Sequence, residues 1–420
     1  MCFFFQIQGI WVEFELFLLN HLLRFFRIIH FTCSCHCENY LCSVHGQKPS
    51  NQIVLAKSSC MATTSHAPHY PALNGLRGMS IILVVLHHCR FQLEAIPWIG
   101  DFNRQFPLFT DGQFGVQVFF VISGFLITHL LLLEQQRYGQ ISIRGFYIRR
   151  TLRIFPAYYF LLLVYFVLSA LQVFELSWNS WLTSLTYTKY LNWKLDYFTA
   201  HAWSLSIEEQ FYLVWPLLFV WAARWRHTFL LVIVLLCPLV RALNTLTPIE
   251  CLNDLTLFQR LDAIALGCLL AIHRERLADW LTNKRWIIWV VGVWLMAFSP
   301  FGIWSAKFEP AVRAFCAALL GSIGTITTSA IALCILYILH RPKVLLHQFF
   351  AQRWLQQIGI LSYSIYLWQQ LFTSDTGFGR NAFPLNIVFI AVAALLSYYL
   401  VERPFLRLKN LLSEPKGSVK

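Results

Sequence analysis

The chain has 420 residues, of which 57% are hydrophobic and only 13% carry a charge. A soluble domain carries about a quarter charged residues, so this composition argues against a soluble enzyme and against a disordered protein. The formal net charge of +13 would suit a nucleic-acid-binding protein. No long basic run or base-stacking motif accompanies that charge, so we expect no nucleic-acid partner. Composition and charge together predict a protein that crosses the lipid bilayer several times, with basic cytoplasmic loops.

The first sixty residues differ from the rest of the chain. They contain six of the twelve cysteines: Cys2, Cys33, Cys35, Cys37, Cys42 and Cys60. The C-x-C-x-C spacing does not match ordinary structural zinc, and we expect no metal. Met61 opens a plausible start of its own, so we expect residues 1–60 to be an over-extended start outside the fold. The alternative is an extra N-terminal hydrophobic segment over residues 9–29.

From residue 76 onward, ten apolar stretches are long enough to cross a bilayer. They are 78–97, 114–133, 154–173, 204–222, 228–244, 257–272, 286–304, 314–339, 356–373 and 385–402. Residues 178–193 are aromatic and amphipathic, and they favour a lip or a re-entrant segment. The pattern predicts an all-α fold, a polytopic transmembrane bundle of about ten helices.

The loops between these stretches alternate in charge. One set of alternate loops, including the C-terminal tail, carries nineteen Lys and Arg residues, and the other set carries eight. The excess places the first set, and both ends of the helical core, in the cytoplasm. We therefore expect a short cytoplasmic segment over 61–75, one membrane domain over 76–405 and a basic cytoplasmic tail over 406–420.

Ionisable residues inside predicted spans are costly and therefore informative. Arg77 and His88 in the first span lie within about 20° of one helix face and about 16 Å apart along its axis, whereas His87 points about 100° away. The simpler interpretation is a core histidine bonded to a carbonyl, together with an arginine that anchors the span. Two such residues on one face favour a function.

Three arginines precede the third span, and their spacing places them together on one helix face: Arg149, Arg150 and Arg153. Guanidinium groups bind phosphates well, because they are permanently charged and bidentate. A phosphate-bearing donor that enters from the cytoplasm would fit this cluster. Topogenic charge or a contact with anionic lipid is the alternative.

The fourth span contains two adjacent carboxylates. Ser206 and Glu209 fit a capping box, which would leave Glu208 without a local structural task. Glu208 would then pair with an arginine, orient the first-span histidine or bind a substrate hydroxyl. Arg260 and Asp262 enter the sixth span, and pairing with charges on other helices accounts for them.

Seven segments together resemble the acyltransferase 3 family of membrane O-acyltransferases, which modify cell-surface sugars. They are YPALNGLRG with His88, FGVQVFFVISGFLIT (114–128), FYIRRTLRIFP (146–156), WSLSIEEQFYLVWP (203–216), RLDAIALG (260–267), SYSIYLW (362–368) and VERPF (401–405). They occur in family order and cover residues 70–407.

The resemblance implies roles for seven of the residues already singled out. His88 would be the catalytic histidine, Arg77 the first-helix arginine, Glu208 and Glu209 the glutamate pair, and Arg149, Arg150 and Arg153 the arginine motif associated with the acyl-CoA donor. The chain departs from the family at three positions. Asn74 stands where an aspartate is usual, Gln369 where a histidine is common, and Leu371 where a proline often follows.

The implied reaction moves an acyl group, expected to be acetyl, from cytoplasmic acyl-CoA to a hydroxyl of a cell-surface or secreted carbohydrate. His88, Glu208 and Arg77 would be catalytic, with the carbohydrate bound on the extracytoplasmic side of a bacterial inner membrane. A buried neutral histidine can accept the hydroxyl proton during attack. The alternative is a transporter or flippase of lipid-linked sugars that transfers no acyl group. Such transporters usually show paired broken helices or an internal repeat, and we find neither in the sequence.

Overall fold

The computed structural model describes residues 70–94, 96, 111–191, 196–246, 257–284, 286–298, 310–374 and 383–413. These ranges fold into helices joined by short connections and contain no β-strand, which confirms the all-α prediction. The prediction that residues 1–60 are an over-extended start falls outside the described residues, as does most of the segment 61–75.

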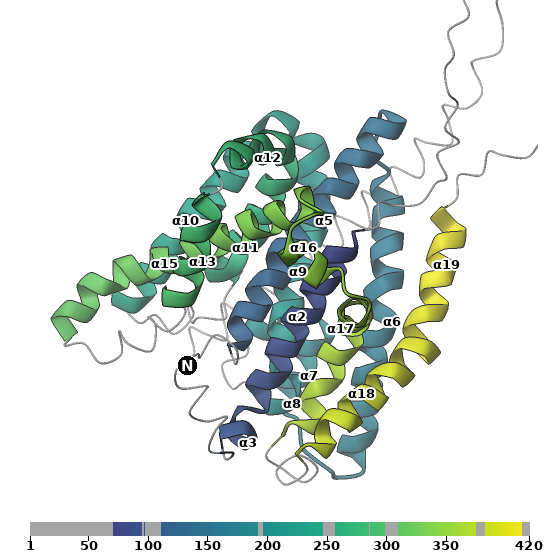
Figure 1. Ribbon diagram of the computed structural model, residues 1–420. Coiled ribbons are helices and arrows are strands. Elements are labelled where there is room, and N and C mark those ends of the chain that lie inside the picture. The colour runs from purple at the N-terminus through teal and green to yellow at the C-terminus, as the bar shows by residue number, and fades with distance from the viewer. Residues whose placement is uncertain are drawn as a thin grey trace, which may run out of the picture. The chain divides into compact units, whose positions relative to one another are not determined.

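Five helices form a central group (Figure 1). They are α2 (Pro71–His88), α5 (Gly112–Tyr138), α6 (Ile143–Ala170), α9 (Ala202–Trp221) and α17 (Arg353–Phe372). Four further helices pack against one another, and two of these, α11 and α15, also pack on α5. They are α10 (Arg226–Leu246), α11 (Leu257–Ile272), α13 (Trp286–Phe298) and α15 (Pro310–His340).

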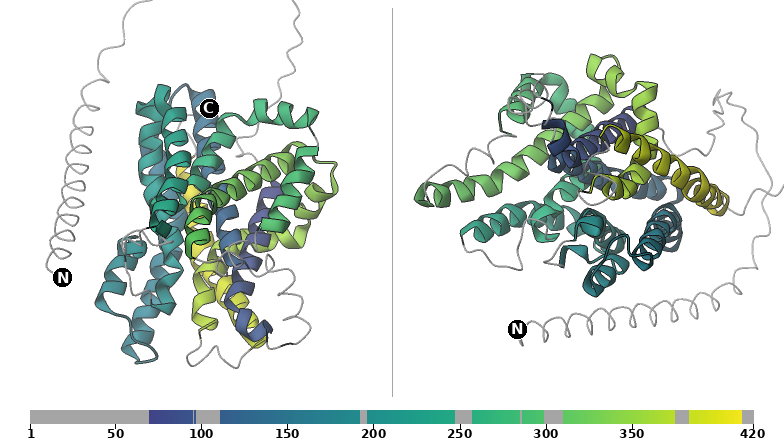
Figure 2. Two further views of the ribbon diagram at one scale, coloured as in Figure 1. Left: turned by 90° about the vertical axis from the view of Figure 1, so that its left-hand side faces the viewer. Right: turned by 90° about the horizontal axis from the view of Figure 1, so that it is seen from below.

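The last helices and the connecting helices complete the bundle (Figure 2). The chain ends in α18 (Leu385–Ser397), a π-helical turn (Tyr398–Glu402) and α19 (Arg403–Ser413), which packs along α6. The connections contain α3 (Arg90–Glu94), α7 (Trp178–Leu185), a 3₁₀ turn (Lys189–Leu191), α8 (Tyr197–Ala200), a second 3₁₀ turn (Ala223–Trp225), α12 (Arg274–Asn283) and α16 (Leu345–Phe350).

Each of the ten predicted spans overlaps one of these helices. Five stretches of the described residues are helical, long and apolar enough to cross a membrane: Gly112–Tyr138, Ile143–Ala170, Ala223–Asn244, Ile323–His340 and Leu385–Lys409. Several others, α9 and α17 among them, carry polar side chains that face the interior of the bundle. The protein is therefore multi-pass.

Local signals at the α5–α6 turn place the predicted arginine cluster. Gly139 ends α5 with a φ of 71°, a left-handed conformation that glycine adopts without steric cost. Ser142 then begins α6, and its side chain accepts a hydrogen bond from the backbone N–H of Gly145. The arginines consequently lie within the first three turns of α6.

Glycines bring α2 and α17 into close contact, as is common between helices in membranes. A Cβ atom at Gly78 would overlap the carbonyl oxygen of Leu355, and one at Gly359 would overlap that of Asn74. Gly75, one turn earlier in α2, faces Phe350. Phe350 ends α16, just before α17, so the starts of α2 and α17 lie close together. Their last residues also lie by the same segment, because Thr373 contacts Tyr197 of α8 and His88 lies within electrostatic reach of His201. The two helices therefore run parallel.

Gly359→Ala should destabilise the protein, because the added methyl group cannot fit between α17 and the backbone of α2. Overpacking of this kind costs about 1–3 kcal/mol. The thermal unfolding midpoint of the purified protein in detergent measures the effect. Gly292→Ala in α13 is the matched control, because nothing lies within 4 Å of a Cβ atom there. Equal midpoints for the two variants would contradict the close contact.

Candidate active site

Arg77 lies where α2 meets α17. Its guanidinium donates a hydrogen bond to the Ser362 hydroxyl, with 3.2 Å between Nη2 and Oγ. It also lies within electrostatic reach of Glu208 on α9, Glu402 in the π-helical turn and Arg153 on α6. Four elements far apart in the sequence therefore converge on one half-buried charge.

Glu208 accepts hydrogen bonds from two neighbours that the sequence did not single out. The Ser123 hydroxyl of α5 lies 3.0 Å from Oε1, and the Tyr212 hydroxyl lies 3.3 Å from Oε2. The Arg150 guanidinium stacks over the Tyr212 ring, 3.7 Å from its centroid. The half-buried Glu208 carboxylate is thus surrounded by donors and cations, which offset the cost of removing its charge from water.

Glu402 is a further buried carboxylate, and sequence reasoning assigned it no role. Its side chain accepts a hydrogen bond of 2.9 Å from the Ser364 hydroxyl and interacts electrostatically with Arg77 and Arg153. It ends a π-helical turn, a feature frequently found at functional sites. The only available signal was its position inside the VERPF segment. We call Arg77, Arg150, Arg153, Glu208 and Glu402 the arginine–glutamate group.

The three predicted arginines do not share one environment. Arg149 forms an ion pair with Glu134 of α5, with 2.8 Å between Nη2 and Oε2. Arg150 and Arg153 instead lie near the carboxylates of the arginine–glutamate group: Arg150 near Glu208 and Arg153 near Glu402. The Nε atom of Arg150 is buried without a hydrogen-bond partner. Lys409 of α19, which lies in the predicted basic tail, also faces these arginines.

His88 is the last residue of α2 and lies at the opposite end of that helix from the arginine–glutamate group. Its ring is half-buried, and the centroid of the His87 ring is 5.5 Å away. His201, just before α9, lies within electrostatic reach of His88. The structure therefore places Glu208 with the arginines and leaves His88 with a second histidine that the sequence analysis did not single out.

A family profile for an acyltransferase domain matches residues 70–403. The chain belongs to the acyltransferase 3 family. The described helices of the central group all fall inside the matched range, so the geometry above is that of the family's domain. The family prediction made from the seven segments is confirmed.

Similar curated proteins are bacterial O-acetyltransferases. The chain is 27% identical to the peptidoglycan O-acetyltransferase OatA of Listeria monocytogenes over 334 residues, which cover 73% of this chain and 50% of that protein. It is 28% identical to the O-acetyltransferase OatA of Staphylococcus aureus over 366 residues, which cover 81% and 58%. The chain thus spans about half the length of these relatives. No solved structure matches it.

The structure shows the surroundings of two residues that depart from the acyltransferase 3 pattern, Asn74 and Gln369. Asn74 lies against Gly359 through its backbone, and Arg77 draws negative charge from Glu208 and Glu402 instead of from position 74. Gln369 is fully buried in α17, and neither polar atom of its side chain has a hydrogen-bond partner.

The capping box predicted at Ser206 and Glu209 is wrong. The helix α9 begins four residues earlier, at Ala202, so Ser206 lies in its second turn and donates to the Ala202 carbonyl. Hydrophobic packing of the preceding residues extends the helix beyond the local signal.

By contrast, Asp262 does pair with another helix, because Arg241 of α10 lies 2.8 Å from its carboxylate.

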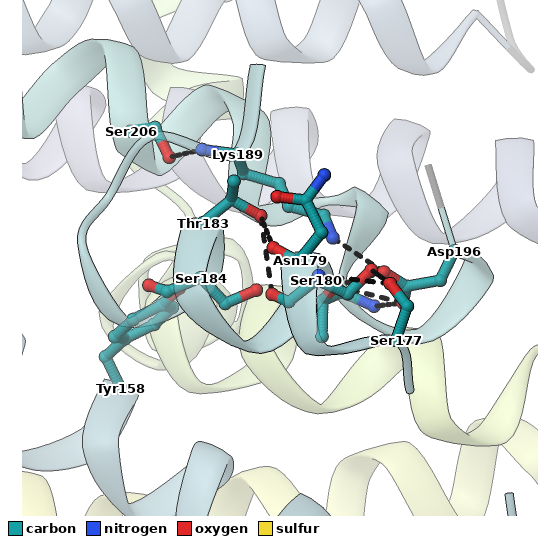
Figure 3. Close-up of polar contacts among 10 residues, drawn as sticks. Tyr158, Ser177, Asn179, Ser180, Thr183, Ser184, Lys189, Asp196 and Ser206 are labelled. Atoms are coloured by element: carbon teal, nitrogen blue, oxygen red, sulfur yellow. Dashed lines mark hydrogen bonds and ion pairs between the residues drawn. The ribbon is translucent and has the colours of Figure 1, made fainter. Parts of the chain in front are cut away.

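A buried ion pair holds the connection between α6 and α9 (Figure 3). The Lys189 side chain is fully buried, and its Nζ atom lies 2.6 Å from Oδ2 of Asp196. The backbone N–H of Lys189 donates to Ser206, which ties this connection to α9. Burial would raise the pKa of the Asp196 carboxyl, but Lys189 and neighbouring hydroxyls lower it overall, so the carboxylate stays charged. The pair fixes the segment that leads to His201.

Asp196→Asn should destabilise the protein strongly, because it leaves the Lys189 ammonium buried without a counter-charge. Breaking a buried pair in this way costs about 3–5 kcal/mol. The double variant Lys189→Met/Asp196→Asn should recover most of the loss, since it removes the orphaned charge. Thermal unfolding of the three proteins in detergent measures this. A double variant no more stable than the single one would contradict the pairing.

Proposed function

We propose that the protein is a membrane O-acyltransferase that moves an acetyl group from acetyl-CoA to a carbohydrate hydroxyl. The observation that carries the proposal is the arrangement along α2. Near one end of the helix, Arg77 lies within electrostatic reach of Arg153 and of two glutamates, and His88 lies at the other end. Membership of the acyltransferase 3 family and the names of the relatives support this reaction class.

The arginine end of the domain suits the phosphates of coenzyme A. Arg150 and Arg153 would hold them, assisted by Lys409, and Arg149 would form the outer edge of the site through its pair with Glu134. The buried Nε–H group of Arg150 has no hydrogen-bond acceptor, and a buried donor left unpaired is costly. A phosphate oxygen would supply that acceptor. Arginine forks match phosphate oxygens better than lysine does.

The spacing between Arg77 and His88 fits a long, thin donor. The two residues are eleven positions apart in one helix, which corresponds to about 16 Å along the axis. The extended pantetheine arm of the donor would follow α2, and the thioester it carries would lie beside His88. Acetyl-CoA supplies an activated acyl carbon there.

His88 would act as the base in a direct transfer. Its ring accepts the proton of the acceptor hydroxyl while the hydroxyl oxygen bonds to the thioester carbonyl carbon. The carbon–sulfur bond then breaks, and His88 returns the proton to the departing thiolate. Glu208 and Arg77 would position the donor next to this histidine from the arginine–glutamate group.

We propose that the arginine end faces the cytoplasm and that the domain spans the membrane about ten times over residues 76–405. The Lys and Arg excess in alternate loops supports this orientation. The acceptor would then be bound on the extracytoplasmic side, in the inner membrane of a bacterium. Peptidoglycan is the acceptor that the name of the Listeria monocytogenes relative indicates.

Replacing His88 should abolish the reaction. Membranes containing His88→Gln protein should release no thiol from acetyl-CoA above background, even with cell-wall glycan present, because the base is lost. Release of the free CoA thiol is the measurement. His87→Gln is the matched control, since this neighbour points about 100° away from His88, and it should keep most of the wild-type rate. Wild-type release by a well-inserted His88→Gln protein would refute the assignment, and a transporter would release no thiol in any variant.

Arg150→Gln should weaken donor binding. The KM for acetyl-CoA should rise about tenfold or more, as expected for a lost hydrogen bond to a charged group, while the KM for the glycan stays within about twofold. Arg144→Gln removes an exposed arginine from the first turn of the same helix and serves as the control. A larger rise with Arg144→Gln than with Arg150→Gln would place the donor elsewhere.

A further inference from the structure

Buried polar atoms without hydrogen-bond partners gather at the His88 end of the bundle. The structure gives no partner of ordinary geometry to either ring nitrogen of His201, to either polar atom of the Gln369 side chain, or to Oε1 of Gln370. His201 is 4% exposed and Gln369 is 0% exposed. A buried polar atom left unpaired costs about 1–3 kcal/mol, so a concentration of them calls for an explanation.

Two pairs of hydrogen bonds hold the segment that carries His201 against α17. The Tyr366 hydroxyl of α17 contacts the His201 carbonyl oxygen at 2.7 Å and the Ser204 hydroxyl at 2.6 Å. Two turns along α17, Thr373 accepts a hydrogen bond from the Tyr197 hydroxyl. On its own segment, His201 follows Tyr197 and precedes Ser204, so its ring lies along the stretch that both pairs hold against α17.

The glutamines lie between the same two contact points on α17. At 100° per residue, Tyr366, Gln370 and Thr373 fall within about 60° of one helix face, and Gln369 lies directly beside it. The face of α17 that carries both glutamines is therefore the face packed against His201. The ring of His201 also lies 5.5 Å from that of Tyr366.

The register of the parallel helices α2 and α17 places His88 at the same height in the bundle as Gln369. Gly78 of α2 meets Gly359 of α17, and ten residues further along each helix are His88 and Gln369. Electrostatic contact between His88 and His201 agrees with this placement, and burial lowers the pKa of His201 to about 3. The His201 ring is thus neutral at physiological pH. The Phe198 carbonyl lies near one ring nitrogen without ordinary hydrogen-bond geometry, which leaves the other ring nitrogen with no partner.

We propose that His201, Gln369 and Gln370 form the subsite that binds hydroxyl groups of the carbohydrate acceptor beside His88. This inference rests on the proposed function for the identity of the acceptor. Each glutamine amide offers both a donor and an acceptor, as a hydroxyl does, and a neutral imidazole can do the same. A site built to hydrogen-bond hydroxyls discriminates strongly against compounds that lack them. Held in this way, a hydroxyl oxygen meets the thioester carbon as His88 takes its proton.

Binding can be measured without turnover. The wild-type protein in lipid nanodiscs should show a thermal unfolding midpoint that rises with the concentration of a tetrasaccharide of alternating N-acetylglucosamine and N-acetylmuramic acid. Gln369→Met and His201→Phe should lose this rise. Their midpoints without glycan should equal or exceed that of the wild type, because each change removes unpaired buried atoms. Ser397→Ala removes a buried, unpartnered hydroxyl in α18 and is the matched control, which should keep the rise.

The outcomes separate this inference from the proposed function. In turnover, Gln369→Met should raise the KM for the tetrasaccharide about tenfold or more and leave the KM for acetyl-CoA unchanged. Glycan stabilisation of the wild type that depends on Gln369 but occurs without thiol release would support the subsite and refute the acyltransferase. His88-dependent thiol release together with unchanged glycan binding by both variants would overturn the subsite alone. A rise in the KM for acetyl-CoA instead would assign these residues to the pantetheine arm and overturn the proposal.

Discussion

The cost of holding charge inside an apolar bundle governs this structure. Arg77 is half-buried among Glu208, Glu402 and the Ser362 hydroxyl, and each of these comes from a different part of the chain. A buried ion deprived of its partners costs several kcal/mol, so the helices that supply them cannot separate freely. The arginine–glutamate group, together with Ser362, thus fixes the relative positions of α2, α6, α9, α17 and the π-helical turn. Without that arrangement neither end of α2 would face a defined site.

The parallel contact between α2 and α17 then determines which residues of the two helices lie at the same height in the bundle. Glycines bring the two backbones into direct contact, which prevents one helix from sliding along the other. Because Arg77 and His88 belong to one helix, they are held at a fixed separation along α2. A donor with charged phosphates at one end and a reactive thioester at the other matches that separation. The ion pair of Lys189 and Asp196 fixes the remaining segment, which carries His201.

Sequence alone predicted the helical fold well, because apolar stretches of the right length are a local property. It also singled out Arg77 and Glu208, which the structure places in one group, since an ionisable residue in a span is conspicuous; their catalytic roles stay a prediction. The roles of Glu402 and His201 were missed, because their partners lie on helices distant in sequence. The capping box at Ser206 was wrong for a related reason: tertiary packing extended α9 past a valid local signal. Arg149 resembles Arg150 in the sequence, and only its pairing with Glu134 separates the two in the structure.

Transfer across the bilayer tests the account most directly. Sealed vesicles, with the arginine end of the protein facing outward, would hold the glycan tetrasaccharide inside and receive acetyl-labelled acetyl-CoA outside. The wild-type protein should form labelled O-acetyl groups on the enclosed glycan, and the His88→Gln protein should form none. Label that forms only when glycan and acetyl-CoA share one side of the membrane would contradict it.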